Sequence, residues 1–167
     1  MGYALFTARK LSVNSRLNLC NAQIMSNSER ANALTARISA LQSQSSLDKT
    51  TASKNAYTEY SKAIQSASAT YQAVLDNASA TDQQKSDAKD AFNTAQTKAQ
   101  GILNEATADI DAKSAMTDIE IQDLNIQQTQ LDAQKKTLET QLSSYSNELD
   151  GVEKAEEDAV KKAAPKF

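Results

Sequence analysis

Apolar residues recur every three or four positions near both ends of the chain, as on one face of a helix. Only Asn27 interrupts the first pattern, and Gln128 and Lys135 interrupt the second. The two patterns are near mirror images about Ala80, so folding the chain there sets them against each other and predicts an antiparallel helix pair. Their residues are Val13, Leu17, Cys20, Ile24, Ala31, Leu34, Ile38 and Leu41 in the first and Ile121, Leu124, Leu131, Leu138, Leu142, Tyr145, Leu149 and Val152 in the second.

A second matched pair of helical patterns lies between the first two. The linker between these inner patterns contains Thr81 and Gln84, the spacing of a capping box that opens a new helix. The hairpin tip is therefore expected at residues 77–82. The inner patterns consist of Tyr57, Tyr60, Ile64, Ala67, Tyr71, Val74 and Ala78 and of Ala88, Phe92, Ala95, Ala99, Ile102 and Ala106.

Helical continuity is weakest at residues 45–48 and 113–117, where Ser45-Ser46 and the box Thr117-x-x-Glu120 offer new caps. Breaks at both places would give a four-helix bundle. Neither place contains Gly or Pro, so we expect an all-α fold that is a long antiparallel helical hairpin. Residues 1–167 form one unit in this interpretation, with outer arms at 10–45 and 117–160 and an inner hairpin at 48–113. Gly101 either admits the ring of Tyr60 or has no packing role.

Charge supports the same pairing of the outer arms. Residues 1–44 hold five basic side chains, including all four arginines, and one acidic side chain. Residues 117–167 hold eleven acidic side chains and six lysines. Exposed ion pairs contribute little to stability, but opposite charge indicates which helix lies beside which.

The composition excludes most catalytic chemistry. The chain of 167 residues has no His, one Cys, three Gly and one Pro. It therefore lacks the commonest general base and metal ligand, and it has little loop to surround a cleft. Cys20 occupies an apolar-pattern position and is expected to be a small buried hydrophobe. The acidic run Glu153, Glu156, Glu157 and Asp158 is typical of an exposed helix turn rather than of a calcium site. From these features together we expect no enzyme, no metal site and no cofactor.

The N-terminal segment is the best local candidate for an interaction. Tyr3, Leu5, Phe6 and Leu11 are apolar and lie beside Arg9 and Lys10, a pattern typical of a segment that docks on another subunit or on a membrane surface. No stretch is long and apolar enough to span a membrane, and no cleavable signal peptide is evident. The modest basic arm in a chain of pI about 5.0 indicates no nucleic-acid partner.

The paired terminal patterns, the bias toward Ala, Ser, Thr, Gln, Asn and Asp, and the absence of Trp and His resemble exported helical filament proteins. These are the flagellins and the filament subunits of type III secretion systems. The resemblance implies that residues 3–19 carry an export signal and that residues 13–41 and 121–152 are assembly surfaces. Flagellins usually carry a globular insert between their termini, whereas this chain has only helix, so the smaller type III proteins are more similar.

We therefore expect a structural subunit that assembles with itself into a filament or other homo-oligomer, outside the cell and without a cleaved signal peptide. The alternatives are a cytoplasmic coiled-coil adaptor, chaperone or scaffold, and a membrane-surface helical protein that uses its N-terminal segment. The apolar N-terminus favours assembly, because a monomeric adaptor has no reason to expose it. The expected assembly residues are Tyr3, Leu5, Phe6, Leu11, Leu17, Ile24, Leu34, Ile38, Leu124, Leu131, Leu138 and Leu142.

Overall fold

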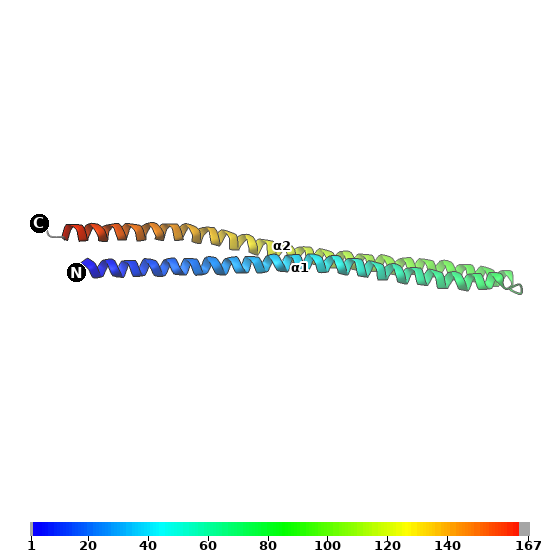
Figure 1. The fold of residues 1–167 in the computed structure, drawn as a ribbon. Helices are drawn as coiled ribbons and strands as arrows, with labels where there is room; N and C mark the ends of the chain where they lie inside the picture. The colour runs from blue at the N-terminus through cyan, green and yellow to red at the C-terminus, as the bar shows by residue number, and fades with distance from the viewer. Residues whose placement is uncertain (1, 164–167) are drawn as a thin grey trace. The chain divides into compact units, whose positions relative to one another are not determined.

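The chain forms two helices that pack against each other, as a computed structural model of residues 2–163 shows; side chains are described from residue 4 onward (Figure 1). Helix α1 spans Gly2–Asp76 and helix α2 spans Asp82–Ala163. No strand occurs among the described residues. The predicted all-α helical hairpin is therefore confirmed.

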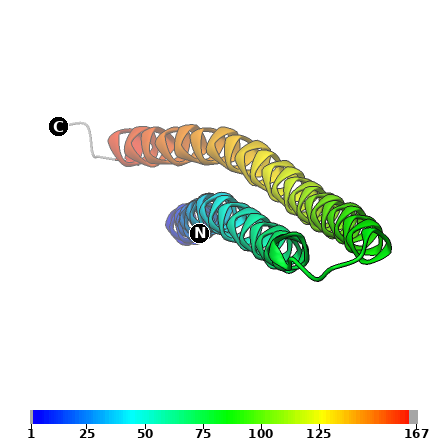
Figure 2. The ribbon, with the colours of Figure 1, turned by 90° about the vertical axis from the view of Figure 1, so that its right-hand side faces the viewer.

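The turn between the helices lies at residues 77–81, inside the predicted range (Figure 2). The Thr81 amide donates to Gln84 Oε1 at 2.9 Å, and the Gln84 amide donates to Thr81 Oγ1 at 3.2 Å. This reciprocal pair is the predicted capping box, and it satisfies two amides at the start of α2. Asn77 shapes the turn, because its side-chain oxygen accepts the Ser79 amide at 3.0 Å and its carbonyl accepts the Ala80 amide at 2.9 Å.

Both helices run without interruption, α1 through residues 45–48 and α2 through residues 113–117, so the four-helix alternative is wrong. At the first place, Gln44 Nε2 donates to Asp48 Oδ1 at 2.7 Å, one helical turn away. At the second, the Thr117 hydroxyl donates to the Lys113 carbonyl at 3.1 Å, so it bonds within the helix and caps nothing. No Gly or Pro forces the backbone to turn at either place, so the helical hydrogen bonds continue through both.

Contacts within the chain group into two units. Unit 1 consists of Met1–Ile38 and Gln122–Phe167, and unit 2 consists of Ser39–Ile121. Each unit pairs one segment of α1 with one segment of α2. Unit 1 holds most of the expected outer arms, and unit 2 holds the expected inner hairpin.

The seam of unit 1 repeats with the alternating three- and four-residue steps of a heptad. Val13, Cys20, Leu124 and Val152 are its buried residues. Two of its polar interruptions have partners across the helix pair, since Asn27 Nδ2 donates to Gln134 Oε1 at 3.4 Å and Gln128 Nε2 donates to Thr35 Oγ1 at 3.1 Å. These bonds offset part of the cost of placing amides between helices.

The seam of unit 2 follows a different repeat over residues 92–117 of α2. Phe92, Leu103 and Ser114 occupy equivalent covered positions eleven residues apart, with successive steps of three, four and four. An eleven-residue repeat averages about 3.67 residues per turn, close to a straight helix, so this stretch avoids the left-handed supercoil of a heptad. Within the unit, Tyr71 and Phe92 stack across the helices with ring centroids 5.7 Å apart.

Burial corrects three of the predicted seam positions of unit 2, of which Ala78 is exposed and lies in the turn rather than in the seam. Ile102 is 49% exposed while Leu103 is 9% exposed, and Tyr57 is 63% exposed while the neighbouring Ala56 is half-buried. The sequence pattern assumed that steps of three and four residues alternate strictly along the seam. In both helices the structure instead has two four-residue steps in succession. The predicted seam then falls one residue out of register with the real one.

Gly101 does not admit the ring of Tyr60. A Cβ built at Gly101 meets nothing within 4 Å, so the glycine faces open space and has no packing role.

Candidate assembly surface

The residues expected to drive assembly divide into two groups. Leu5 and Leu11 face solvent, with exposed fractions of 70% and 74%. The side chain of Tyr3 lies outside the described residues. The remaining expected residues lie in the seam of unit 1, where Leu124 is buried and the others are half-buried: Phe6, Leu17, Ile24, Leu34, Ile38, Leu131, Leu138 and Leu142. These side chains pack within the chain, so Leu5 and Leu11 are the expected residues most open to another molecule.

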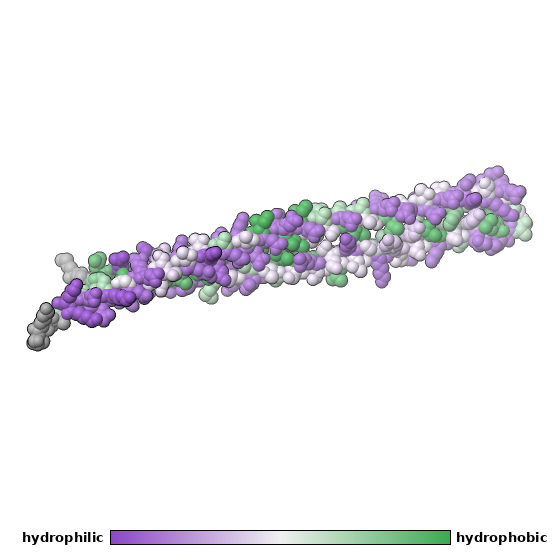
Figure 3. Space-filling model, turned by 90° about the horizontal axis from the view of Figure 1, so that it is seen from above, coloured by the Kyte–Doolittle hydropathy of each residue, from purple (hydrophilic) through white to green (hydrophobic). Residues whose placement is uncertain are grey.

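Four further large hydrophobic side chains of unit 1 are exposed although the sequence pattern did not predict them: Leu19, Met25, Ile126 and Val160. Leu19 is 59% exposed and Met25 is 65% exposed. Leu19 follows Leu5 by fourteen residues and Met25 follows Leu11 by fourteen, which is two heptads in each case. A search for heptad repeats outside the seam would have found both pairs. Hydrophobic surface is visible between polar side chains in the view of Figure 3.

One face of unit 1, called here the arginine face, carries all four arginines of the chain. Arg9, Arg16, Arg30 and Arg37 each precede a seam position of α1, and multiples of seven residues separate them. Leu5 and Leu19 lie on the same side of the helix by heptad position. Across the seam, α2 places glutamines and one glutamate on this face: Gln127, Gln134, Gln141 and Glu148.

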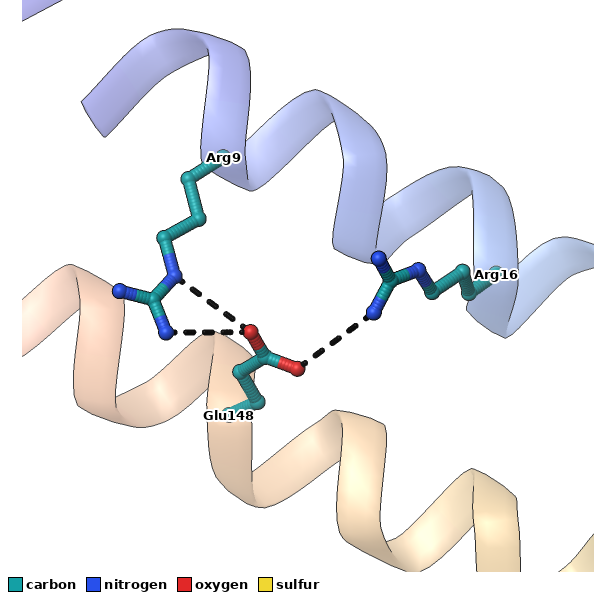
Figure 4. Close-up of polar contacts among 3 residues, drawn as sticks. All are labelled: Arg9, Arg16 and Glu148. Carbon is teal, nitrogen blue, oxygen red and sulfur yellow. Dashed lines mark hydrogen bonds and ion pairs between the residues drawn. The ribbon is translucent and has the colours of Figure 1, made fainter. Parts of the chain in front are cut away.

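Contacts across the seam confirm that these residues share a side. Arg9 Nη2 lies 3.2 Å from Glu148 Oε1, and Arg16 Nη1 lies 3.9 Å from Glu148 Oε2 (Figure 4). The Arg16 guanidinium also lies 5.6 Å from the centroid of the Tyr145 ring. Arg30 lines a hollow of about 410 Å³ together with Gln127, Gln134 and neighbouring residues. Because the ion pairs are partly exposed, each contributes at most about 1 kcal/mol and chiefly fixes the register.

The opposite face of unit 1, called here the acidic face, has the other sign of charge. Asp132, Glu139 and Glu153 each follow a seam position of α2 at multiples of seven residues. The facing heptad positions of α1 are polar and uncharged: Asn14, Asn21, Ser28 and Thr35. Leu11 and Met25 lie on this side by heptad position.

The acidic end of α2 makes ion pairs with lysines. Lys10 Nζ lies 3.8 Å from Glu153 Oε1 and also pairs with Glu156, and Lys161 Nζ lies 2.7 Å from Glu157 Oε1. The pairs made by Lys10 lie across the seam, as the opposite charges of the two arms predicted. Three carboxylates of the acidic run Glu153 to Asp158 thus have lysine partners.

Other features offer little chemistry. Cys20 is 4% exposed, as predicted, and its thiol lies 3.9 Å from Gln141 Oε1. Unit 2 contains an open hollow of about 340 Å³ lined by small and charged side chains, among them Asp48, Lys49, Asp109 and Lys113. No group of three potential metal ligands occurs among the described residues. In the same part of the chain, neither helix has a stretch apolar enough to cross a membrane.

Comparisons with known proteins add no relative. No family model matches the chain, and no similar curated protein or solved structure was found.

Proposed function

We propose that this protein is a non-enzymatic structural subunit that assembles with copies of itself, into a filament or another homo-oligomer, through the faces of its paired helices. The observation that carries the proposal is the set of four large apolar side chains exposed on the α1 segment of unit 1, which form two pairs fourteen residues apart. Leu5, Leu11, Leu19 and Met25 are 59 to 74% exposed, whereas few side chains of the same unit are buried. Large apolar side chains that repeat along a helix outside its own seam are typical of a surface that another chain covers.

The free energy gained by burying these four side chains sets the scale of their contribution to assembly. Burying one fully exposed Leu or Met side chain stabilises a complex by roughly 1.5 to 3 kcal/mol. At their exposed fractions, the four side chains contribute about 4 to 8 kcal/mol before the costs of association. A dissociation constant of 1 μM corresponds to about 8 kcal/mol. The exposed apolar residues therefore support micromolar assembly only if additional contacts offset the costs of association.

Sedimentation velocity and negative-stain microscopy of the purified chain at micromolar concentration test the proposal. We expect a species heavier than the 18.0 kDa monomer. The double variant Leu19→Ser/Met25→Ser should shift the distribution toward monomer while the far-UV circular dichroism stays helical. The matched control is Ala36→Ser, an exposed position on neither face, and it should assemble like the wild type. A wild-type monomer at all concentrations would contradict self-assembly and favour the adaptor or scaffold function.

The proposed location outside the cell rests on the resemblance to exported filament subunits. The segment that this resemblance assigns to export begins α1, where Leu5 is exposed and Phe6 is half-buried. Deleting residues 2–8 should remove secretion in the native host and weaken assembly while leaving most helix content, because the deletion removes two turns at one end. Unchanged secretion of the deletion variant would refute the export role of this segment, and retention of the wild type inside the cell would refute the location.

A further inference from the structure

We propose that the arginine face of unit 1 binds the acidic face of unit 1 in a second copy of this chain. This inference rests on the proposed self-assembly and names the two surfaces that meet. A second copy is the occupant of each face, because the row of four arginines on one face and the row of Asp132, Glu139 and Glu153 on the other are opposite in sign.

The spacing of the charged residues on the two faces matches. The arginine row has arginines at positions 9, 16, 30 and 37, and Gln23 lies at the one heptad position between them that has no arginine. The acidic row has residues at 132, 139 and 153, and Ser146 occupies its vacant position. One heptad advances about 10.5 Å along a helix, so both rows have charges about 10.5 and 21 Å apart. When the rows align, three arginines face three carboxylates and Gln23 faces Ser146.

The match holds for either direction of the neighbouring helix. With α1 parallel to the α2 of the next copy, Arg30 faces Glu153. With the two helices antiparallel, Arg30 faces Glu139. Arg9 and Arg16 remain able to take a second carboxylate, because their side chains are 62% and 53% exposed despite their shared contact with Glu148.

Each face also offers apolar area with the same spacing. Leu5 and Leu19 accompany the arginines, and Leu11 and Met25 lie on the side of the acidic row. Both pairs are separated by fourteen residues, or about 21 Å. The apolar pairs provide the buried area, and the charges select the opposite face, since contact between two arginine faces or two acidic faces is repulsive.

The contact joins two different surfaces, so after the first contact one copy keeps a free acidic face and the other keeps a free arginine face. Such a heterologous interface continues from copy to copy and yields an open filament or, if the rotation closes, a ring. Assembly through these two faces therefore continues beyond a dimer.

Charge reversal in mixed samples tests the contact. Arg30→Glu reverses one position on the arginine face, and Glu139→Arg or Glu153→Arg reverses one on the acidic face. Each variant alone should assemble at least tenfold more weakly than the wild type in sedimentation velocity at low salt. An equimolar mixture of Arg30→Glu with one of the two acidic-face variants should regain assembly, because every interface in an alternating array then joins opposite charges. Rescue by Glu139→Arg indicates antiparallel helices, and rescue by Glu153→Arg indicates parallel ones.

Matched controls carry the same charge changes away from both faces. Glu29→Arg and Lys154→Glu lie at exposed positions on the outer edges of α1 and α2, and each should assemble like the wild type. Circular dichroism checks that every variant remains helical, and Arg30→Gln with Glu139→Gln replaces any charge reversal that unfolds. Each of these neutral variants should assemble more weakly than the wild type without mutual rescue.

The outcomes separate this inference from the proposed function. A wild type that assembles while the reversals at positions 30, 139 and 153 change nothing overturns the face contact and leaves self-assembly intact. Weakened variants that neither mixture restores also overturn it, because the two faces then meet something other than each other. A monomeric wild type overturns both proposals.

Discussion

Replacing Leu103 or its neighbour Ile102 by alanine separates the observed seam of unit 2 from the one that a strict heptad predicts. Leu103 is 9% exposed and Ile102 is 49% exposed. Leu103→Ala removes three buried carbon atoms, which at about 0.8 kcal/mol each amounts to about 2.4 kcal/mol. Core Leu→Ala changes cost about 2 to 5 kcal/mol, and a seam between two helices relaxes easily, so we expect a loss of roughly 2 to 3 kcal/mol.

Ile102→Ala is the matched control. It removes a side chain that is half in solvent, and alanine favours the helix by a few tenths of a kcal/mol, so the free energy of unfolding should fall by less than about 1 kcal/mol. Urea denaturation followed by circular dichroism gives both values, at one protein concentration because association also stabilises the fold. Equal losses, or a larger loss for Ile102→Ala, would refute the eleven-residue repeat.

Three further experiments test other parts of the fold. Gly101→Ala should raise the free energy of unfolding by up to about 1 kcal/mol, since the new methyl meets open space and alanine favours helix; destabilisation would show that something covers this position. Thr81→Ala should cost about 1 kcal/mol in urea denaturation by removing the cap of α2, and a neutral result would contradict the importance of the capping box. In a Cys20→Ala background, Asn27→Cys with Gln134→Cys should form a disulfide within one chain on mild oxidation, seen on a non-reducing gel; dimers alone would argue for pairing between chains.

The heptad pattern of the outer arms was sufficient to predict which sides of α1 and α2 face each other in unit 1. Its apolar residues are large and its polar interruptions few, so one face of each helix is clearly the more hydrophobic. The Ala-rich inner arms gave a weaker signal, because Ile102 and Leu103 are adjacent and equally hydrophobic. Only contact with the opposite helix determines which of them is covered.

The candidate surface was predicted less completely than the fold. The sequence pattern predicted Leu5 and Leu11 as surface residues, and both are exposed. It also placed seam residues such as Leu17 and Leu138 in the assembly surface. An apolar residue at heptad spacing serves equally well in a seam within the chain or between chains, and the sequence does not distinguish the two. Leu19 and Met25 were missed because each repeats an apolar residue two heptads away, outside the seam, with a polar residue at the heptad position between them.

The sequence by itself determined the helical fold, the position of the turn and the cap formed by Thr81 and Gln84. These features depend on local bonds and on an apolar period that each segment carries alone. The tertiary structure decided that the seam shifts to Leu103 and that the arginine row and the row of Asp132, Glu139 and Glu153 lie on opposite faces of unit 1. The reason is geometric, since a helix of 3.6 residues per turn does not fit a seven-residue repeat evenly, and the packing of one helix on the other sets which side chains are covered.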